Sequence, residues 1–127
     1  MHALLIDDSK ANRLVINSYM TELGFKVTEA RDGLEGLHAL KNNPTVNVIL
    51  LDWEMPGMNG LEFQAKVRAD PSKNDLPIIM ISSNDSPEKI TKTLQTGADE
   101  YLVKPISRED LESKLELLGI EPEEGRV

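Results

Sequence analysis

The sequence predicts an α/β fold in which a doubly wound, five-stranded parallel sheet is flanked by five helices. Three observations support this prediction. Short apolar runs alternate strictly with segments of helical periodicity, five times along 127 residues. The connections are short, so successive strands run parallel and the helices cover both faces of the sheet. The runs that begin at Ala3, Val46 and Pro77 are almost continuously apolar, as strands covered on both faces require.

The first two strand–helix units have clear boundaries. Ala3–Ile6 is predicted to be a strand, and the helix after it ends near Gly24, a residue that favours a helix C-terminus. Apolar or aromatic residues recur at helical spacing in this helix: Ala11, Leu14, Val15, Tyr19 and Leu23. Phe25–Ala30 is a more polar strand and is expected near an edge of the sheet. Asp32 and Glu35 then form a variant capping box. The helix that they open carries Leu34, Leu37 and Leu40.

The other three units carry their own start and stop signals. Their strands are Val46–Leu51, Pro77–Ser82 and Glu100–Val103. Asn59 is predicted to cap the helix after the first of these strands. Ser86 caps the next helix, with Pro87 at its first position, and Ser107 with Asp110 starts the last one. A glycine ends each of these last two helices: Gly97 and Gly119.

Composition restricts the class of protein. We expect one domain over residues 1–120 and a frayed tail over residues 121–127. There is no cysteine, which excludes disulfides and thiolate metal sites and fits a reducing compartment. No apolar run approaches the roughly 18 residues of a membrane span, and no signal peptide pattern is present, so a cytoplasmic protein is expected. The net charge of −8 argues against a nucleic-acid partner.

Reactive side chains follow four of the five predicted strands. They are the pair Asp7 and Asp8, then Asp52, Ser82 and Lys104. In an open α/β sheet, ligands bind beyond the carboxyl ends of the strands, and neighbouring strands lie about 4.8 Å apart. We therefore expect these groups to share one pocket. Three carboxylates in one pocket repel one another, and a protonated carboxyl, a lysine or a divalent cation can offset that charge. An all-oxygen set without His or Cys best suits Mg²⁺.

Taken singly, these residues have simpler explanations. An acidic pair after a strand, such as Asp7 and Asp8, is more often a helix N-cap than a metal site. A lone Lys104 is typical of a solvated strand end, and a lone Ser82 is typical of a turn. Asp52 is different, because the predicted cap of the following helix is Asn59, well beyond it. The combination of these residues, in this order, is what indicates a site.

The sequence resembles the CheY-like receiver domains of two-component response regulators. The resemblance extends from about Leu4 to about Leu118 and rests on four segments and their spacing: LLIDDS, ILLDWEMPGMNG, PIIMISS and TGADEYLVKP. It implies a flavodoxin-like fold with the strand order 2-1-3-4-5. It also implies a signalling protein that takes a phosphoryl group from a histidine kinase or a phosphotransfer protein.

The resemblance assigns a role to each carboxylate. Asp52 is the expected phosphoryl acceptor, and Asp7 and Asp8 are the acidic pair that holds Mg²⁺, sharing the ion with Asp52 and the backbone carbonyl of Glu54. The chemistry agrees, since a carboxylate can accept a phosphoryl group and the transfer depends mainly on positioning and charge neutralisation. The Glu54 side chain stands where the family tunes the lifetime of the phosphoryl group. We expect it either to change that lifetime or to be a solvated acid.

The resemblance also predicts a switch. Lys104 is expected to bind the phosphoryl oxygens, and the Lys104–Pro105 peptide bond is expected to be cis. The Ser82 hydroxyl is expected to move towards the phosphoryl group while Tyr101 swings inward. The surface of the fourth helix, the fifth strand and the fifth helix would then change for an output protein. The alternative for Tyr101 is a surface aromatic residue without a switching role.

Two other functions remain to be compared with this one. A receiver fold can serve as a constitutive, phosphate-independent binding module, although the matches at the strand ends argue against it. A nucleotide- or flavin-binding enzyme would need a Gly-rich loop after the first strand, where DDSKAN stands instead. We expect no metabolic enzyme, only intrinsic phosphotransfer and autodephosphorylation. The absence of a linker pattern in the tail favours a receiver that acts alone, by protein contact.

Overall fold

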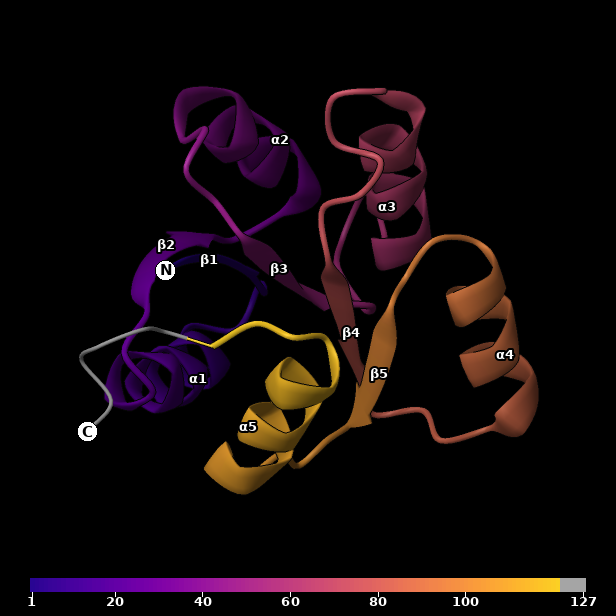
Figure 1. The fold of residues 1–127 in the computed structure, drawn as a ribbon. Coiled ribbons are helices and arrows are strands. Elements are labelled where there is room, and N and C mark those ends of the chain that lie inside the picture. Colours follow the sequence, from indigo (N-terminus) through magenta and orange to yellow (C-terminus); the bar gives the residue numbers. More distant parts are fainter. Residues whose placement is uncertain (122–127) are drawn as a thin grey trace.

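The computed structural model describes residues 1–121, and this part of the chain forms one parallel sheet in the order β2-β1-β3-β4-β5 (Figure 1). The strands are β1 His2–Ile6, β2 Lys26–Ala30, β3 Val48–Asp52, β4 Ile78–Ser82 and β5 Glu100–Val103. The helices are α1 Lys10–Glu22, α2 Gly33–Asn42, α3 Gly60–Ala69, α4 Pro87–Gln95 and α5 Arg108–Leu117. The predicted fold class and strand order are confirmed, and the more polar β2 is an edge strand. Apart from Glu121, the predicted tail lies outside the described residues.

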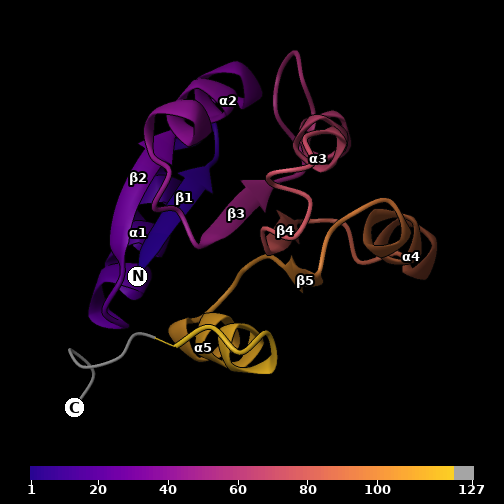
Figure 2. The ribbon, with the colours of Figure 1, turned by 45° about the horizontal axis from the view of Figure 1, so that its top comes forward.

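The sheet separates two hydrophobic cores, because successive side chains of a strand point to opposite faces. On one face, α1 and α5 cover residues such as Leu5, Leu50 and Ile81. On the other face, α2, α3 and α4 cover residues such as Leu4 and Ile49 (Figures 1 and 2). Burial on both faces explains why β1, β3 and β4 are buried along their whole length.

The predicted helix starts are confirmed, with one difference in detail. Asn59 with Glu62, and Ser107 with Asp110, form complete capping boxes at α3 and α5. Ser86 caps α4, with Pro87 in its first turn. At α2, Asp32 accepts a hydrogen bond from the backbone N–H of Glu35, but the Glu35 carboxylate accepts from the backbone N–H of Arg31 instead of returning to Asp32. The variant capping box is therefore only half formed. These caps fix the helix starts without any tertiary contact.

The buried faces of two helices differ from the sequence pattern. In α1 the buried residues are Ile16 and Met20, whereas Leu14 and Val15 are 62% and 48% exposed. In α2, Leu34 belongs to the apolar residues of the predicted helix but is 63% exposed. The helical spacing of apolar residues correctly predicts both helices, but packing decides which residues of each helix face the sheet.

Every helix within residues 1–121 is too short or too polar to cross a lipid bilayer.

Candidate functional site

The register of the strands brings the predicted site residues to one edge of the sheet. Ile6 pairs with Leu51, so Asp7, the next residue after Ile6, lies level with Asp52, the last residue of β3. Asp52 pairs with Ile81 and Ser82 pairs with Val103, which places Ser82 and Lys104 at the same edge. The expected convergence at the carboxyl ends of β1, β3, β4 and β5 is therefore present in the structure.

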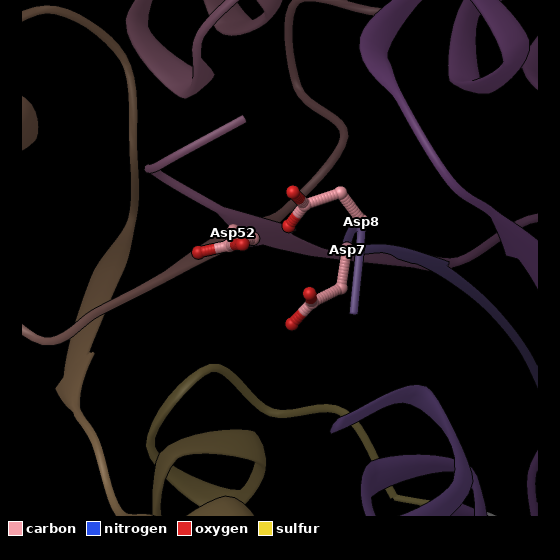
Figure 3. A group of neighbouring side chains, drawn as sticks. All are labelled: Asp7, Asp8 and Asp52. Atoms are coloured by element: carbon pink, nitrogen blue, oxygen red, sulfur yellow. The ribbon is translucent and has the colours of Figure 1, made fainter. Parts of the chain in front are cut away.

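Asp7, Asp8 and Asp52 form an acidic cluster at this edge (Figure 3). One carboxylate oxygen from each residue lies within 4.8 Å of the others, and Asp7 and Asp52 are buried whereas Asp8 is exposed. The N-cap alternative for the acidic pair is wrong, since Ser9 caps α1 by accepting a hydrogen bond from the Asn12 backbone N–H. The all-oxygen donor set and its excess of negative charge fit a hard divalent cation such as Mg²⁺.

Asp52 is nearly sealed from solvent and is paired with one lysine. It is 3% exposed, and its Oδ1 atom lies 3.1 Å from the Nζ atom of Lys104. Burial, followed by repulsion from Asp7, raises the pKa of Asp52 to about 6, although Lys104 acts in the opposite direction. A buried carboxylate held between a like charge and a single cation is destabilised as an anion, so further positive charge near it would be stabilising. The Lys104–Pro105 peptide bond is cis, as the resemblance implied.

The Glu54 side chain is 42% exposed, but its carboxylate is bound by neighbouring side chains from two elements. Its Oε2 atom accepts a hydrogen bond of 2.5 Å from the Ser82 hydroxyl, and its Oε1 atom accepts from the backbone N–H and hydroxyl of Ser83, both at 3.3 Å. Lys89 of α4 donates to the same Oε2 atom at 3.1 Å, and its Nζ atom lies 3.7 Å from the centre of the Trp53 ring. Burial acts to raise the pKa of Glu54, but the hydrogen bonds from Ser82 and Lys89 outweigh it and lower the pKa.

Sequence reasoning missed Lys89, although one signal was available. Ser86 caps α4, so Lys89 stands at the third helical position, where a capping box places Glu or Gln. A cation in the first turn also opposes the helix dipole. A lysine at such a position is favoured by an anion nearby, and in the structure Glu54 is that anion.

Tyr101 points inward in this structure. It is 7% exposed, it packs with the core that α2, α3 and α4 cover, and its hydroxyl donates a 2.9 Å hydrogen bond to the backbone carbonyl of Asn84. It is not a surface aromatic residue. Tyr101 therefore connects β5 to the loop that carries Ser82 into α4.

Comparison with known proteins identifies the family. The family described as the response regulator receiver domain matches residues 3–116, which is most of the chain. This chain is a response regulator receiver domain. The receiver is 40% identical over 127 residues to a chemotaxis protein CheY homolog of Campylobacter jejuni, and the alignment covers 98% of each chain.

Solved receiver structures share the fold closely. A high-resolution structure of the Vibrio cholerae chemotaxis protein CheY4 has a TM-score of 0.85 and 34% identity, and the match covers 91% of this receiver and 96% of that chain. A CheX-CheY-BeF3-Mg²⁺ complex from Borrelia burgdorferi has a TM-score of 0.88 and 25% identity, with 95% and 90% covered. Proteins of this family act in phosphorelay signalling and are not classical enzymes, so the receiver is a signalling protein.

Proposed function

We propose that this receiver accepts a phosphoryl group on Asp52 from a phosphohistidine of a histidine kinase or a phosphotransfer protein. The observation that carries the proposal is the position of Asp52, buried beside Lys104 and grouped with Asp7 and Asp8. A carboxylate fixed at the last residue of a buried strand is a rigid nucleophile. As part of this proposal, we assign the receiver domain to residues 1–120 and place it in the cytoplasm.

The transfer breaks the N–P bond of the phosphohistidine and forms an O–P bond to an Asp52 carboxylate oxygen. The imidazole leaves with the electron pair of the broken bond. A bound Mg²⁺ would supply positive charge to the phosphoryl oxygens, and Asp7, Asp8, Asp52 and the backbone carbonyl of Glu54 are the residues that would hold it. Lys104 contacts Asp52 directly and is placed to neutralise a second part of that charge. Return to the free state is hydrolysis, in which water takes the phosphoryl group from Asp52.

The donor has a surface available beside the acceptor. Asn12, Val15 and Ile16 of α1 and Lys104, Pro105 and Ile106 after β5 line an open groove of about 300 Å³. Val15 and the neighbouring Leu14 are exposed apolar side chains on α1. An apolar surface that includes the Lys104 side chain suits the helix of a phosphohistidine donor, because the donor's histidine must reach Asp52. This groove is our proposal for the donor's docking site.

The output is proposed to be a change in the face formed by α4, β5 and α5. Ser82 and Tyr101 would be the switch residues. Ser82 lies at the same edge of the sheet as Asp52, and the Tyr101 hydroxyl donates a hydrogen bond to the loop between β4 and α4. The relative from Borrelia burgdorferi was solved as a complex with CheX, BeF₃ and Mg²⁺. That complex shows that a related receiver can bind a second protein in the presence of BeF₃ and Mg²⁺, and we propose that an output protein binds this receiver when Asp52 is phosphorylated.

The test is intact mass after incubation with Mg²⁺ and a small-molecule phosphodonor such as acetyl phosphate. We expect one phosphoryl adduct on the wild type and none on Asp52→Asn, which keeps the size of the side chain. An adduct that persists in Asp52→Asn would contradict the assignment of the acceptor. Absence of an adduct on the wild type, with both a small donor and a histidine kinase, would favour the constitutive binding module.

A further inference from the structure

Glu54 holds the donors that a phosphoryl group on Asp52 would need. Ser82 and Ser83 donate hydrogen bonds to the Glu54 carboxylate, and Lys89 adds an ammonium group. These donors lie at the same edge of the sheet as Asp52. Hydroxyl and ammonium groups of this kind also bind phosphate in phosphate-binding sites, and here they bind the Glu54 carboxylate instead.

The Ser82 hydroxyl cannot serve Glu54 and a phosphoryl group together. A serine hydroxyl has one proton to donate, and in this structure that proton is directed to Glu54. The Ser82 oxygen already accepts from the Asn84 backbone N–H at 3.0 Å. A second anion beside Glu54 would also be repelled by its carboxylate. Any anion on Asp52 that requires Ser82 must therefore displace Glu54.

Lys89 is placed to follow Ser82 to the new anion. Its Nζ atom lies 3.3 Å from the Ser82 oxygen and 3.1 Å from Glu54, and the face of Trp53 holds it over the site. The Lys89 side chain is only 18% exposed, which limits where it can go when Glu54 leaves. An ammonium group at this distance needs a small rotation to reach an anion that Ser82 also binds.

We infer that Glu54 is an internal competitor for the phosphoryl site and that Lys89 is a second cation for the phosphoryl group, beside Lys104. This inference rests on the proposed function, since it concerns the phosphoryl group on Asp52. Phosphorylation would exchange the Glu54 bonds of Ser82 and Lys89 for bonds to the phosphoryl oxygens. Lys89 would contact the phosphoryl oxygens directly, and because it belongs to the first turn of α4 it would carry the exchange into that helix.

The fold of α4 makes it responsive to this exchange. Within α4, all of whose residues are described, Thr93 alone is buried, and Leu94 is 40% exposed. An element with few buried apolar contacts moves at a small cost in free energy. A change of partner at Lys89, in the first turn, would therefore shift the start of α4.

The test is the binding of beryllium fluoride, an anion that mimics a phosphoryl group on a carboxylate, at saturating Mg²⁺. Trp53 fluorescence follows binding, and the half-saturating concentration does not depend on the amplitude of the signal. Glu54→Gln removes the negative charge of the competitor and leaves only a neutral, weaker acceptor for Ser82, so it should lower that concentration about three- to tenfold. The role of Lys89 is tested in the Glu54→Gln variant, which lacks the Glu54–Lys89 ion pair. Adding Lys89→Met to this variant should raise the half-saturating concentration of beryllium fluoride about three- to tenfold. Lys89→Arg should bind like the wild type.

Matched controls remove the same charges elsewhere on α4. Glu88→Gln and Lys92→Met change exposed residues of this helix, and both should leave beryllium fluoride binding within about twofold of the wild type. Mg²⁺ affinity is measured separately for each variant and each titration is made at saturating Mg²⁺, because Glu54→Gln removes a negative charge that acts on Asp52. The inference would be overturned if Glu54→Gln bound beryllium fluoride more weakly than the wild type, or if Lys89→Met had no effect in the Glu54→Gln variant. The proposed function would still stand in either case, provided that the wild type binds beryllium fluoride. A wild type that binds no beryllium fluoride would overturn both.

Discussion

Asp52 carries a cost in stability that its function explains. Its pKa is raised from an ordinary value of 3.8 to about 6, so between these pH values the folded protein holds the proton more tightly than the unfolded chain. Without a divalent cation, the contribution of Asp52 to stability should therefore fall as the pH rises from about 4 to about 6. Asp52→Asn should raise the free energy of unfolding at pH 8 by about 1–3 kcal/mol and by much less at pH 4. Urea unfolding in EDTA measures both values.

The control for Asp52→Asn is Asp75→Asn, which removes the same charge from an exposed loop. It should change the free energy of unfolding by less than about 0.5 kcal/mol at either pH. An Asp52→Asn variant that is no more stable than the wild type at pH 8 would show that Lys104 compensates fully for the burial of the carboxylate.

Glu54 should shorten the lifetime of the phosphoryl group. The sequence alone left the direction open, whereas the contacts of Glu54 with Ser82 and Lys89 indicate it. In Glu54→Ala these two donors are free to bind the phosphoryl group, so we expect its loss to slow by about two- to tenfold. The decay of the phosphoryl adduct by intact mass, compared with wild type and Glu88→Ala, measures the effect. Equal decay in all three proteins would show that Glu54 has no part in hydrolysis.

At the scale of the elements, local signals were predictable and packing was not. Asn59, Ser86 and Ser107 begin their helices as expected, because a cap is satisfied by the backbone next to it. The exposure of Leu14, by contrast, depends on which stripe of α1 meets the sheet. The contact between Glu54 and Lys89 joins residues 35 positions apart and required the position of α4. Long-range geometry of this kind cannot be read from a local pattern.

Two glycines bring helices close to the sheet and give a matched pair of variants. A Cβ atom on Gly60 of α3 would meet the Met80 sulfur at 2.9 Å and also the backbone of Trp53 at 3.0 Å and of Asp52 at 3.1 Å. A Cβ atom on Gly36 of α2 would meet only the side chains of Ile6 and Phe63 among its nearest atoms. Both Gly→Ala changes should destabilise by about 1–3 kcal/mol through overpacking. Only Gly60→Ala displaces the acceptor's backbone, so it alone should slow phosphorylation. Urea unfolding measures the loss of stability, and the initial rate of adduct formation measures phosphorylation. Equal rates of adduct formation in both variants would contradict the proposed effect of Gly60→Ala on the acceptor.

At the scale of the whole molecule, the order of strands creates the site. The acidic cluster needs β1 beside β3, which are separated in the chain by β2 and two helices. Apolar periodicity predicted a parallel sheet but not this order, which came from the resemblance. Once the order is known, the alignment of Asp7 with Asp52 follows from the register. Site and fold were therefore predictable together, through motifs at the strand ends.

A cation that binds the cluster should stabilise the whole domain. The carboxylates of Asp7, Asp8 and Asp52 repel one another only when folding brings them together, so Mg²⁺ binds the folded state in preference to the unfolded chain. At one hundred times its Kd, Mg²⁺ should add about 2.7 kcal/mol to the free energy of unfolding. That gain corresponds to a rise in Tm of about 10 °C for a domain of this size.

The variant that tests the site is Asp8→Ala. Asp8 is exposed, so the change should spare the core and move the rise in Tm to higher Mg²⁺ concentration. Asp75→Asn should respond to Mg²⁺ like the wild type, and sodium chloride at matched ionic strength should give a much smaller rise, because screening does not replace a bound ion. A wild-type Tm that stays constant up to high Mg²⁺ concentration would contradict the metal site. An unchanged Mg²⁺ response in Asp8→Ala would instead limit the site to Asp7 and Asp52.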